Sequence, residues 1–215
     1  MARLASGLAP ILTVDAERPS PRRVDEFVSA LRRGGVVVYP TDTVYAIGAC
    51  ALDRGAVDRL YRIKRMDRGH PLTFVCADVG SVARFAAVSD FAYRWLRRLL
   101  PGPYTIVLEA TRAVPRILLG ERKQRTIGVR VPDHAFLTAA VRALDAPLVG
   151  TSAIDPERDQ VFQDAAEIRQ RLGAKVDLIL DGGLLGTVPS TIISLVGDQL
   201  EIVREGKGPI APLMG

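Results

Sequence analysis

The stretch YPTDTVYAIG, residues 39–48, directly follows a run of three valines at 36–38. The valines predict a buried β-strand, because consecutive β-branched residues are typical of strands that are covered on both faces. A proline and three polar residues, Thr41, Asp42 and Thr43, then stand where the strand should end. An unpaired polar group that is buried there costs about 1–3 kcal/mol. We therefore expect these side chains to bond either within their own turn or to a ligand.

On both sides of this stretch, helical and strand patterns alternate along the chain. Apolar residues recur at helical spacing in residues 20–35, 53–66, 91–103, 134–147 and 163–176. Strand patterns occupy residues 36–40, 71–78, 104–111, 125–134, 148–153, 177–183, 190–197 and 199–206. This order predicts an α/β fold with an open, twisted sheet of mixed strand direction and helices packed on it. We expect a single domain over residues 1–215, with residues 1–20 as a loose N-terminal segment.

The composition indicates an ordinary soluble protein, with 48% hydrophobic and 25% charged residues. No apolar run approaches the roughly 20 residues that cross a bilayer. Acids and prolines follow the short N-terminal apolar patch too soon for a secretion signal, so we expect a cytoplasmic protein without membrane contact. With two histidines, His70 and His134, and two distant cysteines, Cys50 and Cys76, no protein metal site is expected.

The net charge of +5 favours phosphate-bearing partners, either nucleotides or nucleic acids. The alternative is an arginine-rich composition whose side chains only solvate helix faces. One basic cluster lies in the predicted helix 53–66 and just beyond it, and it contains Arg59, Arg62, Lys64, Arg65 and Arg68. Arg62 and Arg65 are three residues apart and share a face, which Arg68 continues if the helix reaches that far.

Hydroxyl and basic residues stand at the ends of several predicted strands. They are Thr41 and Thr43, Thr126 and Arg130, Thr151 and Ser152, Ser190 and Thr191, and Arg204. Ligands commonly bind α/β sheets at strand ends, and this set suits a small ligand that carries phosphates and a carboxylate. No Ser/His/Asp spacing, Walker-type loop or paired carboxylates occur, so an enzyme of this kind would act by positioning and charge stabilisation. Each residue alone also fits a turn or a helix cap.

Seven blocks give the chain a resemblance to the YrdC-like family, between about residue 36 and residue 206. In family order they read YPTDTVYAIGACALD, YRIKRMDRGHPLTFVC, LPGPYTIVLEA, RTIGVRVPDH, TSA, PSTIISL and VREG. The resemblance implies a twisted α/β sheet around a basic concave face. It also implies a nucleotidyltransferase that makes L-threonylcarbamoyl-adenylate from L-threonine, bicarbonate and ATP, with release of pyrophosphate. That product feeds tRNA modification, so tRNA and other tRNA-modification enzymes are the implied partners.

Carried over residue by residue, the resemblance suggests two groups of site residues. Those around L-threonine are Thr41, His70, Arg130, Ser152 and Ser190. Those around the nucleotide are Lys64, Arg65, Arg68, Thr126 and Arg204. Lys64 and Ser152 are the implied catalytic residues, and Arg130 would pair with the threonine carboxylate. A Mg²⁺ ion would arrive bound to the ATP phosphates rather than to the protein.

The sequence departs from the synthase pattern at three places. Lys64 matches the lysine of the family's K-x-R-P motif, but Met66 and Asp67 occupy its arginine and proline positions. Ile154 stands where synthases have an asparagine, and Ala46 replaces a glycine. Each lost phosphate contact would remove about 1.5–3 kcal/mol of transition-state stabilisation. These departures resemble the YciO branch of the family.

Two hypotheses follow from these observations. The first is a synthase of threonylcarbamoyl-adenylate or a related carbamoyl-adenylate with reduced activity. The second is a protein that binds double-stranded RNA or tRNA through its basic face, without synthase activity. RNA duplexes are recognised mainly through shape and backbone charge, which an arginine-rich surface can supply.

Overall fold

The valine run forms strand β2 (Val37–Tyr39), which is buried on both faces. Val38 belongs to one apolar core, together with Leu60 of helix α2 (Arg54–Lys64). Tyr39 belongs to a second core, together with Phe27 of helix α1 (Pro21–Arg32). Successive side chains of a strand point to opposite faces, so the sheet separates the two cores. The computed structural model describes residues 7–119 and 125–213.

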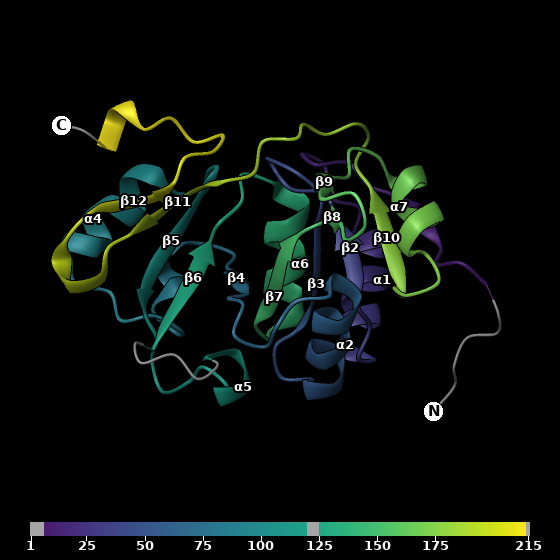
Figure 1. Ribbon diagram of the computed structural model, residues 1–215, viewed down its shortest axis with the longest axis horizontal. Helices are drawn as coiled ribbons and strands as arrows, with labels where there is room; N and C mark the ends of the chain where they lie inside the picture. The colour runs from purple at the N-terminus through teal and green to yellow at the C-terminus, as the bar shows by residue number, and fades with distance from the viewer. Residues whose placement is uncertain (1–6, 120–124, 214–215) are drawn as a thin grey trace.

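The described residues form a mixed, ten-stranded sheet that runs across the molecule (Figure 1). In spatial order its strands are β1 (Ile11–Thr13), β10 (Leu178–Asp181), β2, β3 (Ala46–Cys50), β7 (Leu148–Ser152), β4 (Thr73–Val75), β6 (Thr126–Arg130), β5 (Tyr104–Glu109), β11 (Thr191–Ser194) and β12 (Glu201–Arg204). Strand β10 is parallel to β1 and β2, β4 is parallel to β6, and β5 is parallel to β11. The other neighbours in the sheet are antiparallel. The predicted mixed α/β fold is confirmed.

Helices cover the two faces of the sheet unequally. Helix α1 packs with α6 (Ala135–Leu144) on one face, over β10, β2 and β7. The core of the other face takes side chains from α2, α3 (Val79–Val82), α4 (Asp90–Leu99), α5 (Arg116–Leu119) and α7 (Ala165–Leu172). Short 3₁₀ helices lie at Val196–Asp198 and Ala211–Leu213, and β8 (Ile154–Asp155) pairs with β9 (Gln160–Val161) as a separate hairpin. In the part of the chain that the structure describes, no helix is both long and apolar enough to cross a membrane.

Two expectations about local structure are corrected. Residues 1–20 were expected to be a loose segment, but Ile11–Thr13 pairs with β10 as an edge strand, while residues 1–6 lie outside the described residues. The second predicted helix was expected to reach residue 66, but α2 ends at Lys64. Arg65 adopts a left-handed backbone with a φ of 51°, and its N–H bonds the carbonyl of Arg62. The arginine face on α2 therefore does not continue to Arg68.

Candidate functional site

A cavity of about 300 Å³ lies on the sheet face that α1 and α6 only partly cover. Strand β5 shows how the sequence builds it, because its residues alternate between the two faces of the sheet. Thr105 and Val107 line the cavity, whereas Ile106 and Leu108 are buried in the core of the opposite face. The cavity, called the sheet-face cavity below, thus lies over the face of β4, β5 and β6, and residues at the ends of neighbouring strands also line it.

The sheet-face cavity is polar and positively charged. Its described lining contains Arg130, Arg204 and His70 and no aspartate or glutamate. The hydroxyl groups come from Tyr39, Thr41, Thr73, Thr105, Thr126, Thr151, Ser152 and Ser190. Burial lowers the pKa of the Arg204 guanidinium, and repulsion by the positive charge of Arg130 lowers that pKa further. A lining of this kind favours a small anionic ligand with several hydrogen-bonding groups.

The turn after β2 bonds to itself and also holds an arginine. The Thr41 hydroxyl accepts the N–H groups of Thr43 and Val44 at 3.1 and 3.2 Å and donates to the Val44 carbonyl at 2.6 Å. Arg130 Nη2 donates to Asp42 Oδ1 at 2.6 Å and to Thr43 Oγ1 at 2.8 Å. The turn therefore fixes the guanidinium at the end of β6.

The ion pair between Arg130 and Asp42 is nearly buried, since the side chains are 10% and 11% exposed. Within the described residues, Arg130 Nε and Asp42 Oδ2 are both buried without a hydrogen-bond partner. A buried donor in this state is unfavourable until a water molecule or a ligand bonds to it. Arg130 therefore has both a fixed position and unused capacity to donate.

The opposite wall is formed by the start of β11 and the end of β12. The hydroxyls of Ser190 and Thr105 are 2.8 Å apart, and Arg204 Nη2 donates to the Ser190 carbonyl at 2.8 Å. The N–H of Gly206 donates to the Thr191 hydroxyl at 2.9 Å, which ties the chain after β12 to β11. The antiparallel pair of β11 and β12 thus places a serine and an arginine at the same wall.

The structure brings together seven of the ten predicted site residues. The residues that line the sheet-face cavity are Thr41, His70, Thr126, Arg130, Ser152, Ser190 and Arg204. Lys64, Arg65 and Arg68 do not line it, and they lie on α2 or directly after it. Arg65 pairs with Glu157 at 3.4 Å and Arg68 pairs with Asp58 at 3.1 Å, both at exposed positions.

Lys64 is buried at the end of α2, and its Nζ donates to the carbonyl of Ile154 at 2.9 Å. Burial lowers the pKa of its ammonium group to about 8, and the nearby carboxylates of Asp159 and Asp155 only partly oppose that effect. The residue thus lies beside Ile154, one of the positions where the sequence departs from the synthase pattern. Met66, another such position, packs its partly buried side chain against the core.

Ion pairs already occupy three of the four arginines, on α2 and just after it, that were considered for RNA binding. Arg59 lies 3.0 Å from Asp177, and Arg65 and Arg68 have the acidic partners given above. Arg62 donates only a long bond, 3.4 Å, to the carbonyl of Asp58. These pairs lower the positive charge that α2 offers to a phosphate backbone. RNA binding stays a prediction, without support from this helix.

Sequence reasoning missed several groups of the site. Thr73, the first residue of β4, and Thr105 of β5 line the cavity, and Tyr39 lies buried beneath it. A Cβ atom on Gly150 would lie 2.6 Å from the Tyr39 hydroxyl, so glycine is needed for the phenol to rest on β7. The available signal was a single threonine within each of two largely apolar strands, β4 and β5. The role of Asp42 as the partner of Arg130 had no signal in the sequence.

No group of three or more His, Cys, Asp or Glu side chains that could hold a metal ion occurs in residues 7–119 and 125–213. How a magnesium ion would be bound stays a prediction.

Comparison with known proteins agrees with this geometry. The Sua5–YciO–YrdC family profile, described as telomere recombination, matches residues 29–206. The chain is 39% identical over 201 residues to the uncharacterized protein YciO of Escherichia coli K12, covering 94% of this chain and 97% of YciO. The crystal structure of E. coli YciO superposes with a TM-score of 0.89 at 38% identity, over 95% of this chain and 99% of that chain.

Of two further similar proteins, one is named as a synthase and the other has a structure with a bound ligand. The threonylcarbamoyl-AMP synthase of Thiobacillus denitrificans is 36% identical over 173 residues, covering 79% of this chain and 89% of the synthase. The crystal structure of P. abyssi Sua5 complexed with L-threonine matches with a TM-score of 0.87 at 28% identity. It covers 95% of this chain and 60% of that chain.

Proposed function

The chain belongs to the Sua5–YciO–YrdC family, and on this premise we propose that it binds L-threonine in the sheet-face cavity and forms L-threonylcarbamoyl-adenylate. The co-substrates in this proposal are bicarbonate and ATP, and the second product is pyrophosphate. The support from relatives is the similarity to a synthase of that name and to a Sua5 structure with bound L-threonine.

One observation carries the proposal: the sheet-face cavity presents an arginine, fixed by Asp42 behind it, among hydroxyl groups. Its volume of about 300 Å³ suits an amino acid and leaves the rest of an adenylate to extend outside. The guanidinium of Arg130 matches a carboxylate in planar, bidentate fashion, which lysine would not reproduce. Its position is set before any ligand arrives, because Asp42 and Thr43 already hold it.

The proposed reaction forms a C–N bond and a P–O bond, and it releases water and pyrophosphate. Bicarbonate first takes up a proton and loses water, which gives carbon dioxide. The amine of bound threonine attacks carbon dioxide from bicarbonate and loses a proton, which gives a carbamate. A carbamate oxygen then attacks the α-phosphorus of ATP, and the bond between that phosphorus and the pyrophosphate oxygen breaks. Arg130 would hold the carboxylate while Ser152 and Ser190 orient the carbamate. Positive groups near the leaving pyrophosphate would stabilise its developing charge.

The end of α2 would face the phosphates, and there the proposal includes a reduced rate. Lys64 is the cation that remains, and its ammonium is engaged by the carbonyl of Ile154. The side chains of Met66 and Ile154 cannot bond a phosphate oxygen. Each missing contact would cost about 1.5–3 kcal/mol in the transition state. Product made here would be consumed by enzymes that modify tRNA.

A pyrophosphate-release assay with omission of each reactant tests the proposal. Purified protein is incubated with L-threonine, bicarbonate, ATP and Mg²⁺, and each of the first three is left out in turn. The proposal predicts slow release of pyrophosphate that needs all three. Release that continues without threonine would assign the cavity to a different substrate. The Arg130→Lys variant is the matched control, and its rate should fall to background.

A further inference from the structure

A second and larger cavity, of about 810 Å³, lies between α4, α6 and the loop that precedes α6. Pro132 is the only described residue that lines both this cavity and the sheet-face cavity. The second cavity, called the α6 cavity below, therefore forms a separate site. Nothing in the proposed synthase reaction uses its polar groups.

The innermost polar group of the α6 cavity is His134, which is only 6% exposed. Its Nδ1 is buried and has no hydrogen-bond partner among the described residues. Burial lowers the pKa of the imidazole, whereas the carboxylates of Asp42, Asp133 and Asp15 raise it. A buried imidazole nitrogen without a partner is unfavourable, and a bound ligand or water would relieve this.

His134 also occupies the N-cap position of α6, but it forms no side-chain cap, and the first turn of the helix has no acidic residue. The N-terminus of a helix carries partial positive charge and N–H groups that favour anions. Here that end opens into the cavity, because Ala135 and Thr138 of the first turns also line it. The helix end and His134 thus point to the same kind of ligand.

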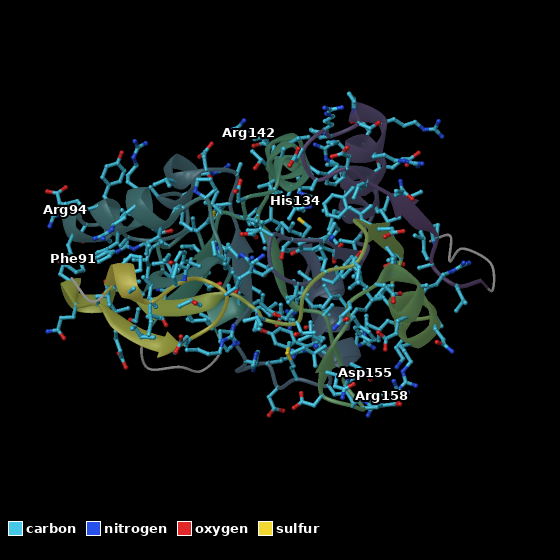
Figure 2. All side chains as sticks on the ribbon, turned by 90° about the horizontal axis from the view of Figure 1, so that it is seen from above. Phe91, Arg94, His134, Arg142, Asp155 and Arg158 are labelled. Carbon is cyan, nitrogen blue, oxygen red and sulfur yellow. The ribbon has the colours of Figure 1, made fainter. Side chains whose placement is uncertain are left out.

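The charged residues around the α6 cavity leave one cation unpaired. Arg142 pairs with Asp78 at 3.2 Å, and Asp78 also accepts the N–H of Ser81 at 2.8 Å. Arg97 has no ion-pair partner within the described part of the chain, and Asp133 is the remaining acid of the cavity lining. Figure 2 shows His134 and Arg142 on the α6 side of the molecule. Arg97 is therefore the cation of this lining that can pair with a ligand phosphate.

The rest of the α6 cavity offers apolar and aromatic surface. The ring of Tyr93 on α4 is 50% exposed and lines the cavity, together with Leu100 and Pro101. An exposed aromatic ring is a surface on which a planar base can stack. From these features we infer that the α6 cavity binds a nucleoside monophosphate, with its phosphate at His134 and Arg97 and its base on Tyr93.

The chain has only two histidines, and each lines one of the two cavities. The imidazole Cε1–H signals in a ¹H–¹³C spectrum therefore report on the sites separately. Adenosine monophosphate should move the His134 signal in a saturable way, with a dissociation constant of about 1 mM or tighter. Inorganic phosphate would make only the contacts to His134 and Arg97, and adenosine only the contact to Tyr93. Each should therefore bind at least about tenfold more weakly than adenosine monophosphate.

Two arginines of α4 provide the matched variants. Arg97→Ala should weaken adenosine monophosphate at least about tenfold, because it removes the unpaired cation. Arg94→Ala should leave the titration unchanged, since Arg94 does not line the cavity and lies apart from His134 in Figure 2. No saturable shift at His134, or equal affinities in the two variants, would overturn the inference. Equal binding of adenosine or of free phosphate would overturn the choice of a nucleotide.

The same spectra separate this inference from the proposed function. L-Threonine should move the signal of His70, which lines the sheet-face cavity, and leave His134 in place. If L-threonine does not move the His70 signal, that result contradicts the synthase proposal alone. The response of His134 to adenosine monophosphate tests nucleotide binding in the α6 cavity independently.

Discussion

The sheet-face cavity and the end of α2 differ in how completely their polar groups are organised. In the cavity, the turn after β2 holds Arg130 through Asp42 and Thr43. At the end of α2, Lys64 bonds a backbone carbonyl while Met66 packs against the core. The first region presents a fixed arginine, which suits an anionic ligand, whereas the second offers a lysine that is already bonded and an apolar side chain. If the proposed function holds, the amino acid and the nucleotide should therefore be bound with different strength.

The largest expected effect comes from breaking the buried ion pair of the cavity. Arg130→Ala leaves the 11%-exposed carboxylate of Asp42 without its partner. The free energy of unfolding should fall by about 3–5 kcal/mol, as measured by urea denaturation. Arg65→Ala is the control at the end of α2, because its pair with Glu157 is exposed and should contribute less than about 1 kcal/mol. An equal fall in the free energy of unfolding in Arg130→Ala and Arg65→Ala would contradict the proposed difference between the cavity and the end of α2.

Restoring the missing phosphate contacts should sharpen the comparison. Met66→Arg combined with Ile154→Asn is expected to raise pyrophosphate release about tenfold or more, with each single change giving less. The two side chains would grip one triphosphate, so their effects should couple and not simply add. The melting temperature of each variant controls for damage to the core, since Met66 packs against it. A well-folded double variant with an unchanged rate would show that the phosphates lie elsewhere.

Lys64 should make nucleotide binding depend on pH. Its pKa is lowered to about 8, so the ammonium group is lost as pH rises through that value. ATP affinity should therefore fall between pH 7 and pH 9, by up to about tenfold per unit above the pKa. In Lys64→Arg the charge persists, and the profile should be flat. Threonine affinity over the same range serves as the internal control, because Lys64 does not line the cavity.

The smallest expected effect concerns a single hydroxyl group of the cavity. Ser190→Ala removes the bond to Thr105 at 2.8 Å and one contact to the ligand. Threonine affinity should fall by about threefold to tenfold, which corresponds to one neutral hydrogen bond. Ser194→Ala in the same strand provides the control, because Ser194 does not line the cavity. An affinity that is unchanged in Ser190→Ala would place the ligand away from β11.

Much of the fold could be predicted because its local patterns agree with the tertiary structure. The valine run 36–38 and the helical spacing in residues 20–35 each bury their apolar face as expected. Edge strand β1 was missed because three residues carry no clear pattern and pair only with distant β10. The C-terminal end of α2 was predicted two residues too late, because Arg65 adopts the left-handed backbone that ends the helix. Glycine usually occupies such a position, and its absence here left no signal in the sequence.

The candidate site could be predicted only in part, for a similar reason. Motif resemblance predicted seven residues that line the sheet-face cavity, among them Arg130 and Ser190. It could not show that Asp42 holds Arg130, since this ion pair joins distant parts of the chain. The strand-end reasoning found the hydroxyl and arginine residues that border the cavity, but it did not predict that Thr105 lines the cavity from the face of the sheet.

Titration calorimetry with L-threonine and with ATP tests the central contrast most directly. The two ligands are titrated separately into the same protein in the presence of Mg²⁺. We predict measurable threonine binding, and an ATP affinity at least about tenfold weaker than that for threonine. Threonine should bind because Arg130 is already fixed in the sheet-face cavity. ATP should bind more weakly because Met66 and Ile154, at and beside the end of α2, have apolar side chains. Micromolar binding of ATP with no detectable binding of threonine would contradict the account.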